Sequence, residues 1–314
     1  MTRVVARLDR FLDHPAILPG LIIAGVVFVA FQVMGAAAGH PFAAYDVHAY
    51  WLAGGSDHPY SATIASGFDD SVNLYKYRYP PPLAQVFAVL HLLPFPLVAG
   101  LWIGMLYAIV LVLGGRWAPL VLLFPPTLAE LYLGNVNLLI ALAIVLGFRW
   151  PATWSVVLLT KMTPGIGLAW FAFRREWRQL AIALGATAAV TAVSFVLAPQ
   201  LWREFVDAMT VQAPAAIDVP PAAIQISLPI RLVLALVVVA FGARTDRYWL
   251  VPVAATIAAP ALWWNVFVIL VACVPLLEGR GVTKPLIAPW PARRAAPVAA
   301  PAPASASEAT GARA

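Results

Sequence analysis

The feature that most constrains the fold of this chain is a series of apolar runs, several of them long enough to cross a bilayer. The first run covers residues 16–38 and follows three arginines within residues 3–10. A secretory signal has an apolar core of only about 7–15 residues, so we interpret this run as an uncleaved membrane helix. Backbone polar groups in lipid are satisfied inside helices. The pattern therefore predicts an all-α polytopic membrane protein.

The charged residues are few and mostly basic. They make up 11% of the chain, against about 25% in soluble domains, and the net charge is +6. The basic residues gather at the ends of apolar runs and in the C-terminal segment, which favours anchoring against anionic lipid over nucleic-acid binding. We therefore expect a multi-pass protein of the cytoplasmic (plasma) membrane, with both termini in the cytoplasm and the loop at 39–82 outside.

The number of crossings depends on two interrupted apolar runs. Residues 83–93 supply about half of the roughly 20 residues that a spanning helix needs. Residues 152–173 carry Lys161 at their centre, where a charge in lipid would be costly. If both runs are half-helices there are about eight crossings, and otherwise about ten; we favour eight. In that arrangement Lys161 and the asparagines of 134–137 lie on the same side as Asp46.

The apolar pattern also sets the expected domain organisation. Residues 1–277 predict one transmembrane domain that carries a catalytic loop at about 39–82. Residues 278–314 are basic and rich in Pro and Ala, and they lack the apolar content to build a core. This segment predicts a disordered cytoplasmic tail.

The loop at 39–82 holds four aspartates, three of the five histidines and many aromatic residues. Acids concentrated in one loop of a membrane protein indicate a reaction site. Asp46 is the carboxylate nearest the first helix and is our candidate for a catalytic base; the alternative is an Asp that caps a short interfacial helix. His48 either orients Asp46, binds the acceptor, or is a solvated loop residue.

Metal and disulfide chemistry find little support in the sequence. Asp46, His48, Asp57 and His58 match no defined metal-ligand spacing. The single cysteine, Cys273, rules out an intramolecular disulfide and a Cys-based metal cluster. We expect neither a metal nor another cofactor.

Five short motifs follow one another along the chain, each weak alone and more specific in order and spacing. They are Asp-x-His-x-Tyr-Trp at 46–51, Tyr-x-Tyr-Pro-Pro at 77–81, Gly-Asn-Val-Asn at 134–137, Lys-x-x-Pro at 161–164 and Arg-Arg-x-Trp at 174–177. Over about residues 16–277 the chain resembles glycosyltransferase family 87. Two later segments match less well: Gln225 to Arg231, and Asn265, which stands where the family usually has a His.

The resemblance implies the GT-C fold and a polyprenyl-phosphate-linked sugar donor, as in polyprenyl-phosphate-mannose-dependent mannosyltransferases. The expected function is transfer of a hexose, with mannose favoured, to a lipid-linked or cell-envelope glycan acceptor, with Asp46 as the base. Contacts to the donor phosphate are expected from Lys161, Arg231 and Arg78. Contacts to the sugar or acceptor are expected from His48, Tyr50, Trp51, Tyr79, Asn135, Asn137, Gln225 and Asn265.

These residue types fit what the reaction needs. The acceptor hydroxyl loses a proton as it attacks the anomeric carbon, and one carboxylate can take it. The phosphate leaving group needs cations or hydrogen-bond donors, and a lone Lys161 in an apolar stretch suits that role. The alternatives are that Lys161 snorkels to the interface, that Arg231 and Arg78 are interfacial anchors, and that the asparagines of 134–137 cap the following helix.

Two other function classes stay open. A transporter or flippase for a lipid-linked substrate would predict internal repeats and paired broken helices in matching positions. The sequence contains one Pro-broken segment around Lys161 and no convincing repeat. A non-catalytic member of the fold is the other alternative. Besides the sugar donor and the acceptor, we expect membrane lipids as partners. We expect no binding of nucleic acid.

Overall fold

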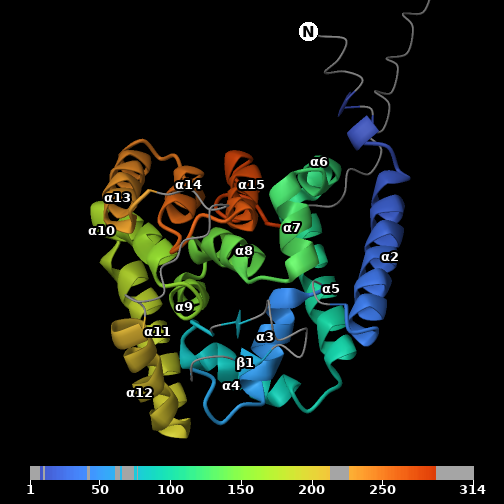
Figure 1. Cartoon of the computed structure of the whole chain (residues 1–314). Coiled ribbons are helices and arrows are strands. Elements are labelled where there is room, and N and C mark those ends of the chain that lie inside the picture. Colours follow the sequence, from blue (N-terminus) through green and yellow to red (C-terminus); the bar gives the residue numbers. More distant parts are fainter. Residues whose placement is uncertain are drawn as a thin grey trace, which may run out of the picture.

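The computed structural model describes residues 8–9, 11–40, 43–60, 64–65, 74–75, 77–212 and 226–287. The protein is all-α, apart from one antiparallel pair of two-residue strands (Figure 1). The elements are α2 (Ile17–Ala37), α3 (Tyr45–Gly54), β1 (Ile64–Ala65), β2 (Leu74–Tyr75), α4 (Pro81–Leu90), α5 (Phe95–Gly114), η1 (Gly115–Trp117), α6 (Ala118–Leu122), α7 (Pro125–Leu133), α8 (Asn137–Gly147), η2 (Pro151–Thr153), α9 (Trp154–Leu158), η3 (Thr163–Leu168), α10 (Ala169–Phe173), α11 (Trp177–Leu197), α12 (Pro199–Asp207), η4 (Ala208–Gln212), α13 (Leu228–Arg244), α14 (Leu250–Ile257), η5 (Trp264–Ala272) and α15 (Cys273–Leu277).

The expected polytopic membrane class is confirmed by the long apolar helices. Among the described residues, three helices are long and apolar enough to cross a membrane: α2, α5 with its continuation to Leu122, and α11. The pair α7 and α8 qualifies as a fourth if it is one span bent by 113°. Pro and polar residues divide the other apolar runs into shorter helices, so a count of eight to ten crossings stays a prediction.

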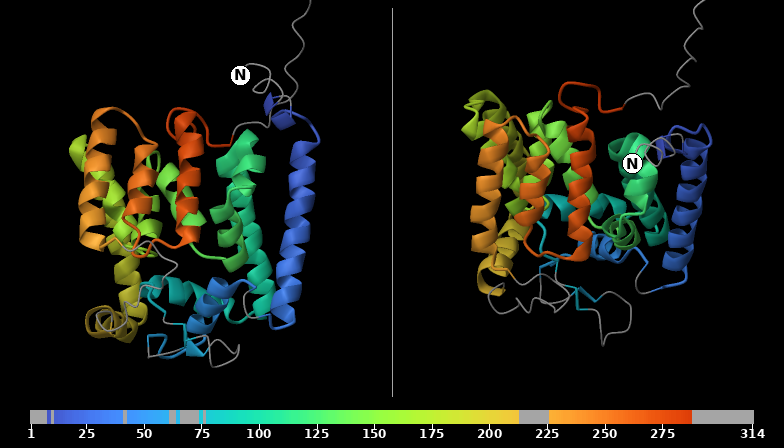
Figure 2. Two further views of the ribbon diagram at one scale, coloured as in Figure 1. Left: turned by 45° about the horizontal axis from the view of Figure 1, so that its top comes forward. Right: turned by 90° about the horizontal axis from the view of Figure 1, so that it is seen from above.

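The long helices stand at the edges of the molecule, and short ones fill its middle. Figure 1 shows α2 beside α5 along one edge, α11 and α12 along the other, and α3 with α4 across one end. Figure 2 shows α13, α14 and α15 as neighbouring helices, with α13 on the same side of the molecule as α11. The outer faces of α2 and α11 present exposed apolar side chains such as Phe31 and Val196, as expected for surfaces that face lipid.

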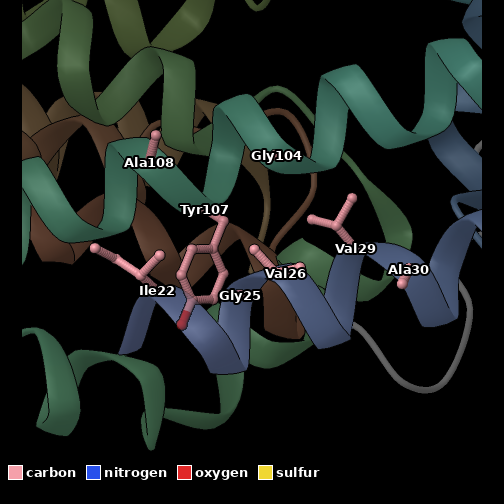
Figure 3. A pocket seen from close by; sticks show the side chains of 8 residues that line it. All are labelled: Ile22, Gly25, Val26, Val29, Ala30, Gly104, Tyr107 and Ala108. Atoms are coloured by element: carbon pink, nitrogen blue, oxygen red, sulfur yellow. The ribbon is translucent and has the colours of Figure 1, made fainter. Parts of the chain in front are cut away.

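A pocket of about 510 Å³ lies between α2 and α5 (Figure 3). Its apolar lining consists of Ile22, Gly25, Val26, Val29, Ala30, Gly104, Tyr107 and Ala108. The Tyr107 ring packs against Gly25, and its hydroxyl donates to the Leu21 carbonyl at 2.8 Å. None of the predicted site residues lines this pocket.

The break between α7 and α8 follows from the sequence Leu-Gly-Asn-Val-Asn at 133–137. Gly134 ends α7 in the left-handed conformation, with φ +76°, which glycine adopts without steric cost. The new helix begins at Asn137, and the two helix axes differ by 113°. The break turns the polar side chains of this segment toward the interior.

We predict that Gly134→Ala destabilises the protein strongly. A Cβ there would lie 2.3 Å from Val47 Cγ2 and 3.1 Å from Ile103 Cδ1, in addition to the unfavourable φ. The expected loss is roughly 2–4 kcal/mol, visible as a lower melting temperature in detergent. Gly104→Ala is the matched control, because nothing lies within 4 Å of its Cβ position. Equal melting temperatures for both variants would contradict the structure at this turn.

The ordered chain continues past the last helix. Arg280, at the start of the segment expected to be a tail, is buried and donates to the Val112 and Leu113 carbonyls at 3.0 and 2.8 Å. A cation at the C-terminal end of α5 is favourable because the helix dipole is negative there. Residues 278–287 therefore pack on the helical domain, and the prediction of disorder for 288–314 lies outside the described residues.

Candidate active site

Asp46 is fixed in the first turn of α3, close to the broken helix. The Ala44 N–H and the Gln32 side chain both donate to the Tyr132 carbonyl, which ties α2 and the start of α3 to the end of α7. Asp46 is only 8% exposed, and its Oδ2 accepts a hydrogen bond from Asn135 Nδ2 at 2.8 Å. The helix N-cap is Ala44 instead, so the alternative that Asp46 is the capping residue is wrong.

Tyrosines surround this contact. The Tyr79 hydroxyl accepts from Asn135 Nδ2 at 3.3 Å and from the Tyr50 hydroxyl at 3.0 Å. The rings of Tyr50 and Tyr79 meet edge to face with centroids 5.1 Å apart. Tyr60 donates to the Tyr79 carbonyl at 2.7 Å, which holds the Tyr79 backbone. Two of the predicted sugar-contacting residues, Tyr50 and Tyr79, therefore lie beside Asp46 and Asn135.

Lys161 reaches the same place from a different part of the chain. It lies in the break between α9 and η3, next to Thr163-Pro164. Its Nζ donates to Asn135 Oδ1 at 3.0 Å and to Asn137 Oδ1 at 2.7 Å. These bonds use two of its three N–H groups. The ammonium therefore lies inside the site, and the snorkelling alternative does not describe it.

A second carboxylate, Glu130 in α7, completes the arrangement. It is fully buried, and its oxygens accept from the Asn137 N–H at 2.6 Å, the Leu138 N–H at 3.2 Å and Asn137 Nδ2 at 2.9 Å. Asn265 Nδ2 also donates to it at 2.9 Å. Glu130 was not among our candidates. As an ionisable residue within an apolar run, it carried the signal that marks functional residues in membranes.

We refer to these side chains as the polar cluster: Asp46, Tyr79, Glu130, Asn135, Asn137, Lys161 and Asn265. Lys161 contacts both Asn135 and Asn137, and Asn135 contacts Asp46. The eight-crossing topology predicts that these side chains lie on one side of the membrane. The polar cluster combines two carboxylates with one ammonium in a setting where buried charges must be paired and hydrogen-bonded. Such a site can accept a proton and can hold an anion.

Two predicted contact residues in α3 point elsewhere. The His48 ring packs against Phe95 at 4.4 Å between centroids, and Trp51 donates to the Leu93 carbonyl at 3.1 Å. Burial lowers the pKa of His48 to about 4, so its imidazole is neutral at neutral pH. Both residues thus contact the junction of α4 and α5. Arg78 is exposed, and Gln225 lies outside the described residues.

Arg231 is apart from the polar cluster. Its guanidinium donates to the carbonyls of Ile226, Ile257, Ala259 and Pro260 at 2.5–3.0 Å. These bonds use four of its five N–H groups and hold the chain that leaves α14. The geometry favours a structural role for Arg231 over the expected contact with phosphate.

We predict that Arg231→Met lowers stability by at least about 2 kcal/mol, because four carbonyl groups, that of Ala259 buried, lose their donor. Thermal unfolding in detergent measures this loss, with Arg244→Met as the control, since Arg244 is exposed at the end of the same helix. Donor KM of the folded protein should be unchanged. A raised donor KM at an unchanged melting temperature would instead identify Arg231 as a phosphate ligand.

In the described part of the chain, no three His, Cys, Asp or Glu side chains lie close enough to hold a metal ion. Asp46 and Glu130 are instead satisfied by amide donors.

Comparison with known proteins gives one family and one relative. The sequence model of glycosyltransferase family 87 matches residues 77–284, which are 208 of the 314 residues. The polyprenol-phosphate-mannose-dependent alpha-(1-2)-phosphatidylinositol pentamannoside mannosyltransferase of Mycolicibacterium smegmatis is 29% identical over 42% of this chain and 38% of its own length. The match therefore spans well under half of that relative, and no solved structure matches. Since the family model covers most of the chain, the protein belongs to glycosyltransferase family 87.

Proposed function

We propose that the protein is a membrane hexosyltransferase that uses a polyprenyl-phosphate-linked sugar, with mannose as the sugar we favour. The membership of family 87 supports glycosyl transfer. The name of the mycobacterial relative supports the polyprenyl-phosphate donor, the mannose and a lipid acceptor. We extend the proposal to lipid-linked or cell-envelope glycan acceptors in general, since the relative shares only part of the chain.

One observation carries the proposal: the Asn135 amide bridges Asp46 and Lys161. The carboxamide holds the Asp46 carboxylate at its NH₂ end and the Lys161 ammonium at its oxygen end. A bound donor could therefore place its sugar at Asp46 and its phosphate at Lys161. The proposed base and the proposed phosphate contact therefore share a site, although they come from distant parts of the sequence.

In the proposed reaction, the oxygen of the acceptor hydroxyl bonds to the anomeric carbon, and Asp46 takes up the proton of that hydroxyl. The bond from that carbon to the phosphate oxygen breaks, and polyprenyl phosphate leaves with the bonding electrons. Lys161 stabilises the negative charge that develops on the phosphate. Because phosphate is a good leaving group, the step needs no general acid.

The surroundings of the site support sugar binding at a membrane surface. Tyr50 and Tyr79 offer aromatic rings and hydroxyls, which suit an amphipathic sugar ring. We place this site on the outer face of the cytoplasmic membrane, with both termini in the cytoplasm, because the basic residues flanking the first helix favour that orientation. The GT-C assignment belongs to the same proposal.

The test uses the full-length protein reconstituted in lipid vesicles with an envelope-lipid extract as acceptor. Radiolabelled polyprenyl-phosphomannose, polyprenyl-phosphoglucose and a nucleotide-linked mannose are supplied in separate reactions. We expect label in the acceptor fraction from the polyprenyl-phosphate donors, with more from polyprenyl-phosphomannose than from polyprenyl-phosphoglucose. We expect none from the nucleotide sugar. Movement of the labelled donor across the vesicle membrane without sugar transfer would indicate a flippase instead of a transferase.

A further inference from the structure

Two asparagines of the polar cluster, Asn135 and Asn137, can adopt only one amide orientation each. A carboxylate accepts hydrogen bonds and an ammonium donates them, so an amide between the two must present its NH₂ to the acid and its oxygen to the Lys. Asn135 does this between Asp46 and Lys161, and Asn137 does it between Glu130 and Lys161. The Lys161 ammonium is thus held by two amides, each oriented by its own carboxylate.

The two carboxylates differ in what else they contact. Glu130 is enclosed by four N–H donors, from the first turn of α8 and from two side-chain amides, and is 0% exposed. It is therefore committed to protein contacts and cannot reach an acceptor hydroxyl. Asp46 retains 8% exposure beside the tyrosines. Of the two, Asp46 is the carboxylate placed to exchange a proton with a substrate.

From this geometry we infer that Glu130 is a positioning residue: it orients Asn137 and thereby sets where the Lys161 ammonium stands for the donor phosphate. This inference rests on the proposed function for its catalytic consequence. The placement of Lys161 itself follows from the hydrogen bonds alone. Asn265 contributes to the same task, since it supplies a fourth donor to Glu130.

The expected effect of Glu130→Gln follows from the same polarity argument. If the new amide oxygen keeps the two backbone N–H bonds, its NH₂ faces the NH₂ groups of Asn137 and Asn265. Asn137 relieves the conflict by turning its amide over, which presents NH₂ to Lys161 and breaks that bond. Donor KM should then rise about tenfold, the effect of losing one charge-assisted hydrogen bond.

The double variant Glu130→Gln with Asn137→Asp restores the polarity. The amide introduced at position 130 would donate to one oxygen of the carboxylate introduced at position 137, and the other oxygen would accept from Lys161. The cluster also keeps its total charge. Donor KM should return close to the wild-type value, whereas a residue needed only for folding would not regain function through a second substitution at 137.

An activity-independent measurement completes the test. The chain has three lysines, and exposed Lys284 is an internal reference for amine labelling followed by mass spectrometry. Glu130→Gln should increase labelling of Lys161 relative to Lys284, and the double variant should reverse this increase. The melting temperature of each protein is recorded alongside. Unchanged labelling in Glu130→Gln, or no reversal in the double variant, would overturn the inference. If the labelling changes as expected but the wild-type protein transfers no sugar, the proposed function is rejected and the positioning of Lys161 by Glu130 stands.

Discussion

Asp46→Asn should lower the rate of sugar transfer by about 10²–10⁴-fold, the range that a positioned general base contributes. The substitution removes the negative charge and the ability to take up a proton, and it replaces one acceptor oxygen with an NH₂ donor. It keeps the size of the side chain and an oxygen that can accept from Asn135. The folded structure should therefore survive, and the loss should appear in kcat with little change in donor KM.

The measurement is the initial rate in reconstituted vesicles at saturating donor, with the melting temperature recorded for each protein. Asp57→Asn is the matched control, because Asp57 is an exposed aspartate that follows the same short helix. The control should retain wild-type activity. If Asp46→Asn transfers sugar as fast as Asp57→Asn, Asp46 is not the base.

Lys161→Met should reduce transfer by about 10²-fold or more and raise donor KM, since the leaving phosphate loses its cation. Met retains the length and apolar stem of Lys without the charge. The asparagine oxygens at 135 and 137 also lose their donor, so a lower melting temperature is expected as well. Rates must therefore be compared at a temperature where the variant is folded.

Lys284→Met provides the control for a lost lysine charge, since Lys284 is exposed on the turn after the last helix. It should bind and transfer like the wild type. A folded Lys161→Met protein with wild-type kcat and donor KM would show that the phosphate is held elsewhere. In that case the bonds from Lys161 to the asparagines would be purely structural.

The course of the helices could be predicted largely from the sequence. The apolar run at 16–38 became α2, and Gly and Pro marked where α7 ends and where α4 begins. The number of membrane crossings could not be predicted in this way. It depends on how the half-length helices pair, and hydrophobic length carries no information about a bend such as the 113° between α7 and α8.

The candidate site was predictable where a polar residue interrupted an apolar run or belonged to a motif. Asp46, Asn135 and Lys161 satisfied that condition, and the structure brings them together. Glu130 also interrupts an apolar run, but it belonged to no motif and was missed, and its pairing with Asn137 depends on the bend. Arg231 satisfied the condition too, but its carbonyl partners follow from the path of the chain after α14, which the sequence does not specify.

At position 265 the chain departs from the family's motif, and the structure shows what the residue there contacts. Asn265 stands where the family usually has a His, and a carboxamide cannot take up a proton as an imidazole can. In the structure its contact with Glu130 needs a donor N–H, and the carboxamide supplies one. The reaction proposed here assigns the proton to Asp46 and requires no acid at position 265.

In the proposed mechanism, Asp46 and Lys161 face one bound donor from the same side of the membrane. A structure of the full-length protein in a lipid nanodisc with a polyprenyl-phosphate sugar bound would test it most directly. We predict a phosphate oxygen at about 3 Å from Lys161 Nζ and the anomeric carbon between that phosphate and the Asp46 carboxylate. A phosphate bound away from Lys161, or a sugar that Asp46 cannot reach, would contradict the account.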